Sequence, residues 1–360
     1  MAANIFDGST DSNWGTAANW SLNAVPNETD GNVATFDATS PNCTVNSFDR
    51  PCNGLNFTGY TNTITMSFNI AVHGSLTLGL DMGVAGSSYL QINAISTMTS
   101  NGKVWPNRLN FSTNATFTLA DNWSIDGLLH IATDSPTING FQITASAGLL
   151  CNAAAAVLGT TNIILDGTGT VTLPTSTTGF RLNLTINTAG TITFAAATGI
   201  YNTGTLTYTA GTVVTTGSTL TCTLATIFAC NGITWNNISF SGTNTKTLSE
   251  NLNLTGLLRL GSTTDNVTLT GNTINAGGGV RYNGTTGTVS GTTVINVNGT
   301  GTLDAPSATS GRIDNPITIN APGGTVTIAT AGDTPFIGLL NKLNYVAGTI
   351  VTDRGTWSTP

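Results

Sequence analysis

One stretch decides the fold: TLADNWSIDGLLHI at residues 118–131. It returns as TLSENLNLTGLLRL at 247–260, and a weaker earlier copy reads TMSFNIAVHGSLTL at 65–78. The copies share a threonine followed by an apolar residue, an asparagine, alternating apolar residues and then a glycine. Alternation with a period of two predicts strands with one buried face. The shared glycine predicts a bend between one strand and the next.

The spacing of these copies predicts the size of a repeating unit. Their glycines are Gly74, Gly127 and Gly256, with a degenerate fourth at Gly204. The separations are 127 − 74 = 53, 204 − 127 = 77 and 256 − 204 = 52. These values fit two, three and two units of about 26 residues, a length typical of repeat solenoids.

Two further repeats support stacking. LTYTAGTVVT at 206–215 returns as LNYVAGTIVT at 343–352, with seven of ten positions identical. Triplets of apolar residue, threonine and apolar residue recur along the chain, at 64–66, 117–119, 171–173, 192–194, 220–222, 267–269 and 317–319. We therefore expect an all-β chain, a right-handed parallel β-solenoid with one strand per rung of about 26 residues. Tandem β-sandwich domains are the alternative, because they too place turns at short and regular intervals.

Composition favours such a stack and excludes several function classes. Charged residues make up 8% of the chain, against about a quarter in an average globular domain. The net charge of −7 argues against nucleic-acid binding, which needs a basic face. No run of about 18 apolar residues is present, so we expect no membrane insertion. Residues 149–158 are the sole candidate for helix, as a short turn between rungs.

The five cysteines are Cys43, Cys52, Cys151, Cys222 and Cys230. An odd number without close CxxC pairs argues against a disulfide framework and against a zinc site. We expect these residues to be small apolar fillers of the core.

The first forty residues differ from the rest. They hold Trp14 and Trp20 in one short window, followed by Val25-Pro26, and show no clean alternation before Val33. Because a solenoid needs atypical ends, we interpret 1–40 as an N-terminal cap or attachment segment, 41–350 as the solenoid body and 351–360 as a C-terminal tail. The two tryptophans are expected to be buried over the end of the core; stacking on a sugar ring is the alternative.

The motif Trp…Asn-Trp…Val-Pro, running from Trp14 through Asn19-Trp20 to Val25-Pro26, resembles the start of phage-encoded virion proteins rich in Thr, Asn and Gly. It is also similar to the opening of β-solenoid passenger segments in bacterial surface proteins. The similarity covers about the first fifty residues by motif and the remainder by composition. The N-terminus lacks a basic head and an apolar core, which predicts no secretory signal peptide and favours the phage interpretation.

Catalytic residues are sparse. The two histidines are His73 and His130, and the aligned copies replace them with Arg, Asp or Thr, as expected for solvated outward positions. Asp121 and Asp126 differ in strand parity, so paired catalytic carboxylates are not expected, and Asp121 fits a turn residue. We expect no enzyme activity, no catalytic or metal-binding residues and no cofactor, and no binding residue can be named.

The sequence thus predicts a phage virion structural protein on the particle surface, as a tail fibre, tail spike or capsid decoration that contributes to host attachment. Expected partners are its own copies in a homotrimer, other virion proteins and a host-surface glycan. A capsular-polysaccharide depolymerase and a bacterial surface adhesin are the alternatives.

Overall fold

The computed structural model is built almost entirely from short strands. It describes residues 2–47, 50–94, 96–132, 135–176, 179–202, 204–230, 232–261, 264–282, 287–305, 312–330 and 343–352. Parallel strands stack in a β-solenoid of about 14 turns with about 1% helix, which confirms the predicted fold class. Strands of the ladders pair in parallel, whereas the sheets of a β-sandwich are antiparallel, so the tandem-sandwich alternative is wrong. The chain divides into two compact units, residues 1–172 with 188–192, and residues 173–187 with 193–360.

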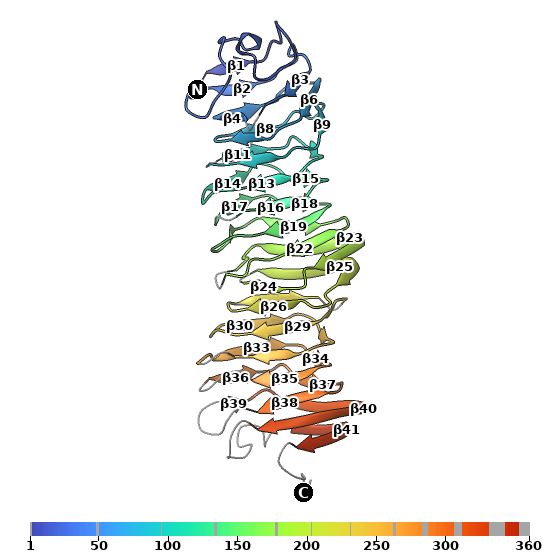
Figure 1. The fold of residues 1–360 in the computed structure, drawn as a ribbon. Coiled ribbons are helices and arrows are strands. Elements are labelled where there is room, and N and C mark those ends of the chain that lie inside the picture. Colours follow the sequence, from blue (N-terminus) through green and yellow to red (C-terminus); the bar gives the residue numbers. More distant parts are fainter. Residues whose placement is uncertain are drawn as a thin grey trace. The chain divides into compact units, whose positions relative to one another are not determined.

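The first unit contains two long ladders and two shorter ones (Figure 1). One long ladder consists of β1 (Ala3–Ile5), β2 (Val33–Thr35), β5 (Gly54–Asn56), β8 (Leu76–Thr77), β11 (Ser96–Thr99), β14 (Thr116–Leu119), β17 (Thr137–Gly140) and β20 (Leu158–Gly159). The other consists of β4 (Arg50–Cys52), β7 (Ile70–Val72), β10 (Leu90–Ile92), β13 (Leu109–Phe111), β16 (Leu129–Ile131), β19 (Gly148–Cys151) and β22 (Gly169–Thr172). The shorter ladders are β3 (Cys43–Val45), β6 (Thr63–Met66) and β9 (Gly83–Gly86), and β12 (Val104–Trp105), β15 (Trp123–Ile125), β18 (Ile143–Ala145) and β21 (Asn162–Leu165).

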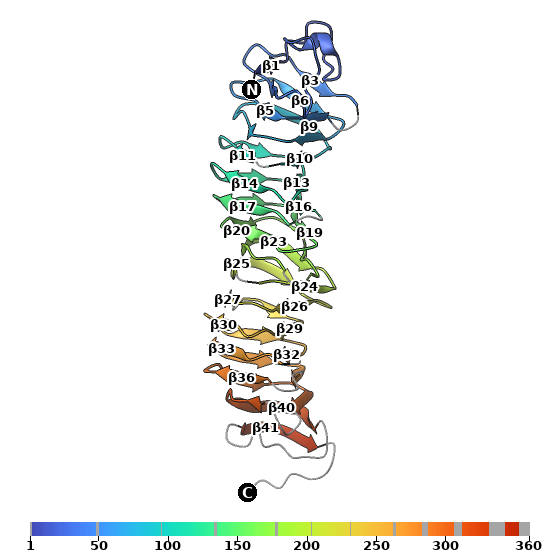
Figure 2. The ribbon, with the colours of Figure 1, turned by 90° about the vertical axis from the view of Figure 1, so that its left-hand side faces the viewer.

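The second unit is built from three ladders (Figure 2). The first holds β25 (Thr205–Val214), β27 (Thr226–Ala229), β30 (Thr245–Leu248), β33 (Val267–Gly271), β36 (Thr288–Gly291) and β39 (Arg312–Ile313). The second holds β24 (Thr198–Ile200), β26 (Thr219–Cys222), β29 (Asn237–Phe240), β32 (Leu258–Leu260), β35 (Gly279–Tyr282) and β38 (Gly301–Ala305). The third holds β28 (Thr234–Trp235), β31 (Leu252–Leu254), β34 (Ile274–Ala276) and β37 (Ile295–Val297). The long strand β40 (Ile317–Thr330) joins the last two ladders and pairs with β41 (Leu343–Thr352), while β23 (Asn183–Phe194) contributes residues to both units.

Most turns use three strands, so the expectation of one strand per rung is wrong. The stretch that decides the fold forms β14, β15 and β16, and its copy at 247–260 lies in β30, β31 and β32. Both sets alternate buried and outward residues as predicted. The apolar-Thr-apolar triplets fall on different ladders of a turn, which is why their spacing does not count turns. Their apolar members are buried throughout: Ile64, Met66, Phe117, Leu119, Val171, Leu173, Ile192, Phe194, Leu220, Cys222, Val267, Leu269, Ile317 and Ile319.

Most turns are shorter than the sequence repeats predict. Phe117 pairs with Ile138 and Leu258 pairs with Val280, which are steps of 138 − 117 = 21 and 280 − 258 = 22. The step reaches the predicted length between β40 and β41, where Ile317 pairs with Leu343 and 343 − 317 = 26. The prediction was too long because Gly74 follows β7 whereas Gly127 follows β15, so the interval between these glycines joins different corners of a turn.

The core consists of stacked aliphatic side chains. Leu109, Leu129 and Leu149 lie in register on three successive strands, and each is fully buried. Burying such a side chain contributes about 1.5–3 kcal/mol. Because each leucine contacts equivalents in the turns before and after it, every turn shields its neighbours from water.

The second repeat found in the sequence has one local geometry. Tyr208 in β25 donates its hydroxyl to the carbonyl of Gly211 at 2.8 Å, and Tyr345 in β41 does the same to Gly348 at 2.6 Å. The two glycines have φ values of 113° and 114°, a region that favours glycine.

An aromatic cluster occupies the N-terminal part of the first unit. Trp14 and Trp20 pack with their ring centroids 4.9 Å apart, and both are buried, which confirms burial rather than exposure for sugar stacking. Phe36 stacks on Phe57 at 4.9 Å, so the cluster continues beyond residue 40. The boundaries of the cap, body and tail stay predictions.

The helix candidate at residues 149–158 does not form. Its first residues belong to β19, and Ala17–Asn19 is the single short 3-10 helix of the described chain. Of the expected tail, Val351 and Thr352 belong to β41, and residues 353–360 lie outside the described part.

Candidate functional site

A row of polar side chains follows the outer face of one ladder in the first unit. Gln91, Asn110 and His130 are the middle residues of β10, β13 and β16, and they pair in register. Their flanking residues are buried, so strand alternation turns these three outward. We call the following set the polar strip: Glu28, His73, Tyr89, Gln91, Asn93, Arg108, Asn110, Ser112 and His130.

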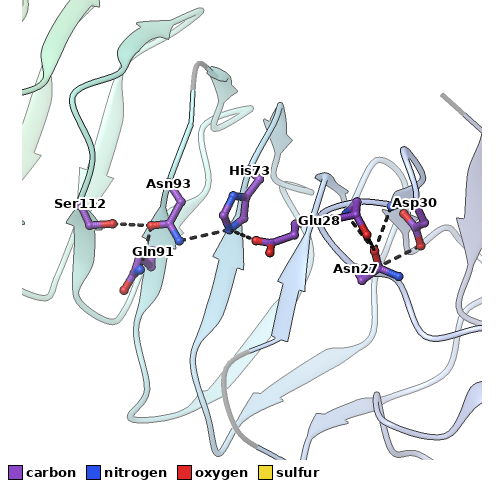
Figure 3. Close-up of polar contacts among 8 residues, drawn as sticks. Asn27, Glu28, Asp30, His73, Gln91, Asn93 and Ser112 are labelled. Carbon is purple, nitrogen blue, oxygen red and sulfur yellow. Dashed lines mark hydrogen bonds and ion pairs between the residues drawn. The ribbon is translucent and has the colours of Figure 1, made fainter.

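The N-terminal half of the polar strip is one hydrogen-bonded chain (Figure 3). Glu28 Oε2 lies 2.9 Å from His73 Nε2, which in turn lies 3.2 Å from Asn93 Nδ2. Asn93 Oδ1 accepts hydrogen bonds from Gln91 Nε2 at 2.8 Å and from the Ser112 hydroxyl. The polar contacts thus run from the loop before β2 across successive turns.

The loop that carries Glu28 is ordered by its own side chains. Asn27 Oδ1 accepts hydrogen bonds from the backbone N–H groups of Thr29 and Asp30 at 2.8 and 2.9 Å. Asp30 Oδ2 accepts from the N–H of Asn27 at 3.2 Å (Figure 3). These local bonds fix the turn that presents Glu28 to His73.

The chain continues into a buried amide. Asn110 Nδ2 donates to Gln91 Oε1 at 3.3 Å, and the Asn110 residue is only 4% exposed. Its Oδ1 atom has no hydrogen-bond partner. Leaving a buried acceptor without a hydrogen bond costs about 1–3 kcal/mol. The Asn110 Oδ1 atom can therefore accept a further hydrogen bond.

A cation lies beside this amide. Arg108 lies over the Tyr89 ring, with its guanidinium carbon 4.8 Å from the ring centroid, and its Nη2 contacts Nδ1 of His130. The Nε atom of Arg108 and the Nε2 atom of His130 have no partner. None of the ion pairs of the described residues includes Arg108.

His130 is neutral near pH 7. Burial, and then the positive charge of Arg108, lower its pKa from 6.5 to about 4. Since Nδ1 faces an N–H donor of Arg108, we assign the ring proton to Nε2, which leaves that N–H as an unused donor.

Both histidines lie on the strip, which differs from the expectation of solvated positions. The His73 side chain is 27% exposed, and His130 is half-buried. Asp121 behaves as the predicted turn residue, because its carboxylate accepts the N–H groups of Ser100 and Asn101, each at 2.7 Å.

The hydroxyl and the histidine of the strip are not paired with each other. The Ser112 hydroxyl donates to Asn93 and not to His73, so these two side chains do not form a nucleophile–base pair. No group of three or more His, Cys, Asp or Glu side chains in the described ranges is placed to hold a metal ion. Among the same residues, no helix has the length and apolar character needed to cross a membrane.

The cysteines lie away from the strip, inside the core. All five are free and buried, as expected for core fillers. Burial raises the pKa of Cys151 and of Cys222 to about 12, which keeps these thiols protonated and unreactive. Lys246 also points inward, and its ammonium group donates to the carbonyls of Ser241 and Asn244 at 2.7 and 3.1 Å. Burial lowers the Lys246 pKa to about 8.

The fold and the strip together define a parallel β-solenoid with an amide-rich outer row. No family model, no curated protein and no solved structure matches the chain in comparisons with known proteins.

Proposed function

We propose that this protein is a structural protein of a bacteriophage particle, exposed on its surface as a tail fibre, tail spike or capsid decoration, where it contributes to host attachment. The observation that carries the proposal is the stack of short strands around a continuous aliphatic core within each unit. Such a stack is stabilised by nearest-neighbour contacts and provides a rigid scaffold from a simple repeat.

The outer layer supports the same role. Charged residues make up 8% of the chain, and outward strand positions include Thr118, Asn253 and Ser290. An uncharged hydroxyl- and amide-rich surface suits contact with neighbouring subunits and with sugars, because these groups both donate and accept hydrogen bonds. The resemblance of the Trp14–Pro26 motif to phage virion proteins points in the same direction.

The direct test is mass spectrometry of purified particles, with copy number per particle as the readout. Immunogold electron microscopy with antibody against the purified chain would then separate capsid from tail placement. Absence of the protein from washed particles would refute the proposal.

Self-association is part of the proposal. We expect a homotrimer, and multi-angle light scattering of the purified chain measures it directly. A strict monomer at micromolar concentration contradicts this expectation.

Release of reducing sugars from host polysaccharide separates a structural role from a depolymerase. We expect no release above that of a heat-denatured control. Sustained release would replace the structural role with that of an enzyme.

A further inference from the structure

The part of the polar strip around Asn110 has the chemistry of a binding site. Tyr89, Gln91, Arg108, Asn110 and His130 lie on adjacent strands or directly before them, and their contacts join Gln91 to Asn110 and Arg108 to both Tyr89 and His130. Except for Asn110, these residues are partly exposed, whereas the atoms Arg108 Nε, Asn110 Oδ1 and His130 Nε2 are themselves buried. We call these five residues the Asn110 cluster.

The unused hydrogen-bonding groups of the cluster specify a ligand. The Nε–H of Arg108 and the Nε2–H of His130 are donors without a partner, and Asn110 Oδ1 is an acceptor without one. Two donors, one of which belongs to a guanidinium, suit a carboxylate, since a guanidinium binds carboxylates through charge-assisted hydrogen bonds. An acceptor among amides suits a hydroxyl donor.

From this combination we infer that the Asn110 cluster binds an acidic saccharide, a sugar ring that carries a carboxylate. The carboxylate pairs with Arg108, and a ring hydroxyl donates to Asn110 Oδ1. Because Arg108 Nε and Asn110 Oδ1 are buried in the free protein, the Arg108 and Gln91 side chains rotate aside when the sugar binds. Tyr89 supports the Arg108 guanidinium by a cation–π contact, which holds it in place for the ligand. The inference rests on the proposed attachment function, for which it names the ligand class.

The net charge of the chain bears on which sugars the Asn110 cluster can bind. The chain carries −7 overall, so it repels anionic polymers at long range. Binding of an acidic sugar therefore depends on the local charge of Arg108. For the same reason a neutral sugar, which lacks the carboxylate contact, binds more weakly.

The test is titration calorimetry with a panel of carboxylated oligosaccharides, namely tetragalacturonic acid, tetraguluronic acid and α2,8-linked tetrasialic acid. Maltotetraose serves as the neutral sugar and sodium acetate as the bare carboxylate. We expect saturable binding of at least one acidic tetrasaccharide, at least tenfold weaker binding of maltotetraose, and no saturable binding of acetate. Absence of binding across the acidic panel, or equal binding of maltotetraose, overturns the inference.

Variants locate the site. Arg108→Ala is expected to weaken binding about ten- to a hundredfold, and Asn110→Ala about tenfold, as is typical of lost hydrogen bonds to charged and neutral groups. Arg259→Ala is the matched control, because Arg259 is an exposed outward arginine in the copy of the repeat at 247–260. Melting curves confirm that each variant is folded, and Arg108→Lys should recover part of the affinity. An Arg259→Ala effect as large as that of Arg108→Ala would place the binding elsewhere and overturn the assignment.

The two proposals fail separately. Binding that depends on Arg108 in a protein absent from particles refutes the virion role and leaves the site intact. Particles that carry the protein, together with no calorimetric binding of the acidic panel, refute the site and leave the virion role intact.

Discussion

Replacing Gly140 with alanine tests whether adjacent turns are as closely spaced as the structure shows. Gly140 ends β17 with a φ of 99°, and it pairs with Leu119 of β14 in the preceding turn (Figure 1). A Cβ atom built on Gly140 would lie 2.3 Å from the carbonyl oxygen of Leu119. This oxygen belongs to the backbone, so the overlap can be relieved only by moving one turn relative to the next.

Two terms set the magnitude. Positive φ at a residue with a side chain costs about 1–2 kcal/mol. The overlap adds about 1–3 kcal/mol, as for other insertions into a well-packed region. The expected loss in the free energy of unfolding is therefore about 2–5 kcal/mol.

Gly31 provides the control. Its φ is 71°, yet nothing lies within 4 Å of the place that a Cβ atom would take, so Gly31→Ala should lose about 1–2 kcal/mol through the backbone alone. Guanidinium unfolding followed by circular dichroism measures both variants. Hydrogen exchange at Phe117 and Leu119 shows whether the loss is local, which matters because two units need not unfold together. Equal losses in the two variants would show that the turns are not in close contact at Gly140.

The core and the polar strip supply three further predictions. Leu129→Ala should lose about 2–5 kcal/mol by opening a cavity in the leucine stack, whereas Leu129→Met should lose less than about 1.5 kcal/mol; denaturant midpoints compare them. The lowered pKa of His130 means that the unfolded chain takes up the proton first, so stability should fall as pH drops from about 6.5 to about 4. Melting temperatures across this range should fall less in His130→Gln; parallel curves would contradict the assignment. Because Cys151 and Cys222 are buried with raised pKa values, Ellman's reagent at pH 8 should react with them only after denaturant is added; reaction in the native state would show that the core is open.

The fold was predictable because the alternation of apolar and polar residues is visible within each short stretch of sequence. A buried face on each short strand shows directly in the sequence, and the copies at 118–131 and 247–260 fold alike. The early copy at 65–78 misled, because its strands β6, β7 and β8 do not occupy the ladders of β14, β15 and β16 in the same order. A glycine after alternating apolar residues occurs at several corners of a turn, so the motif alone cannot fix the register.

The site was not predictable to the same degree. Contacts of the strip join residues about twenty positions apart, as between Gln91 and Asn110. The step from one turn to the next ranges from 109 − 90 = 19 residues between β10 and β13 to 343 − 317 = 26 between β40 and β41. Asparagine is so common in this chain that an outward Asn110 cannot be told from a turn asparagine by pattern alone. His73 and His130 did indicate a site, because histidine is rare in this chain and both residues occupy outward positions. Which residues lie beside them depends on the strand register.

The scarcity of charge follows from the stacking itself. In a parallel ladder, equivalent outward residues lie about 4.8 Å apart, and like charges at that distance repel. Amides avoid this cost, because each can donate to one neighbour and accept from the other: Asn275 donates to Asn253 at 2.8 Å and accepts from Asn296 at 3.0 Å.

Such a row must end with an unused group. The row that contains Asn296 ends where the next turn has Thr318, and Asn296 Oδ1 has no hydrogen-bond partner. The row that contains Asn110 ends where the next turn has His130, and Asn110 Oδ1 has no hydrogen-bond partner either. The two ends differ in their surroundings, because a cation without an acidic partner among the described residues accompanies Asn110. A row that ends beside Arg108 leaves an acceptor on Asn110 and a charged donor on Arg108 for an outside molecule. Hydrogen bonding between stacked amides keeps the outer face nearly uncharged. On this ladder it stops at the Asn110 cluster, and a ligand bound there can complete the hydrogen bonding.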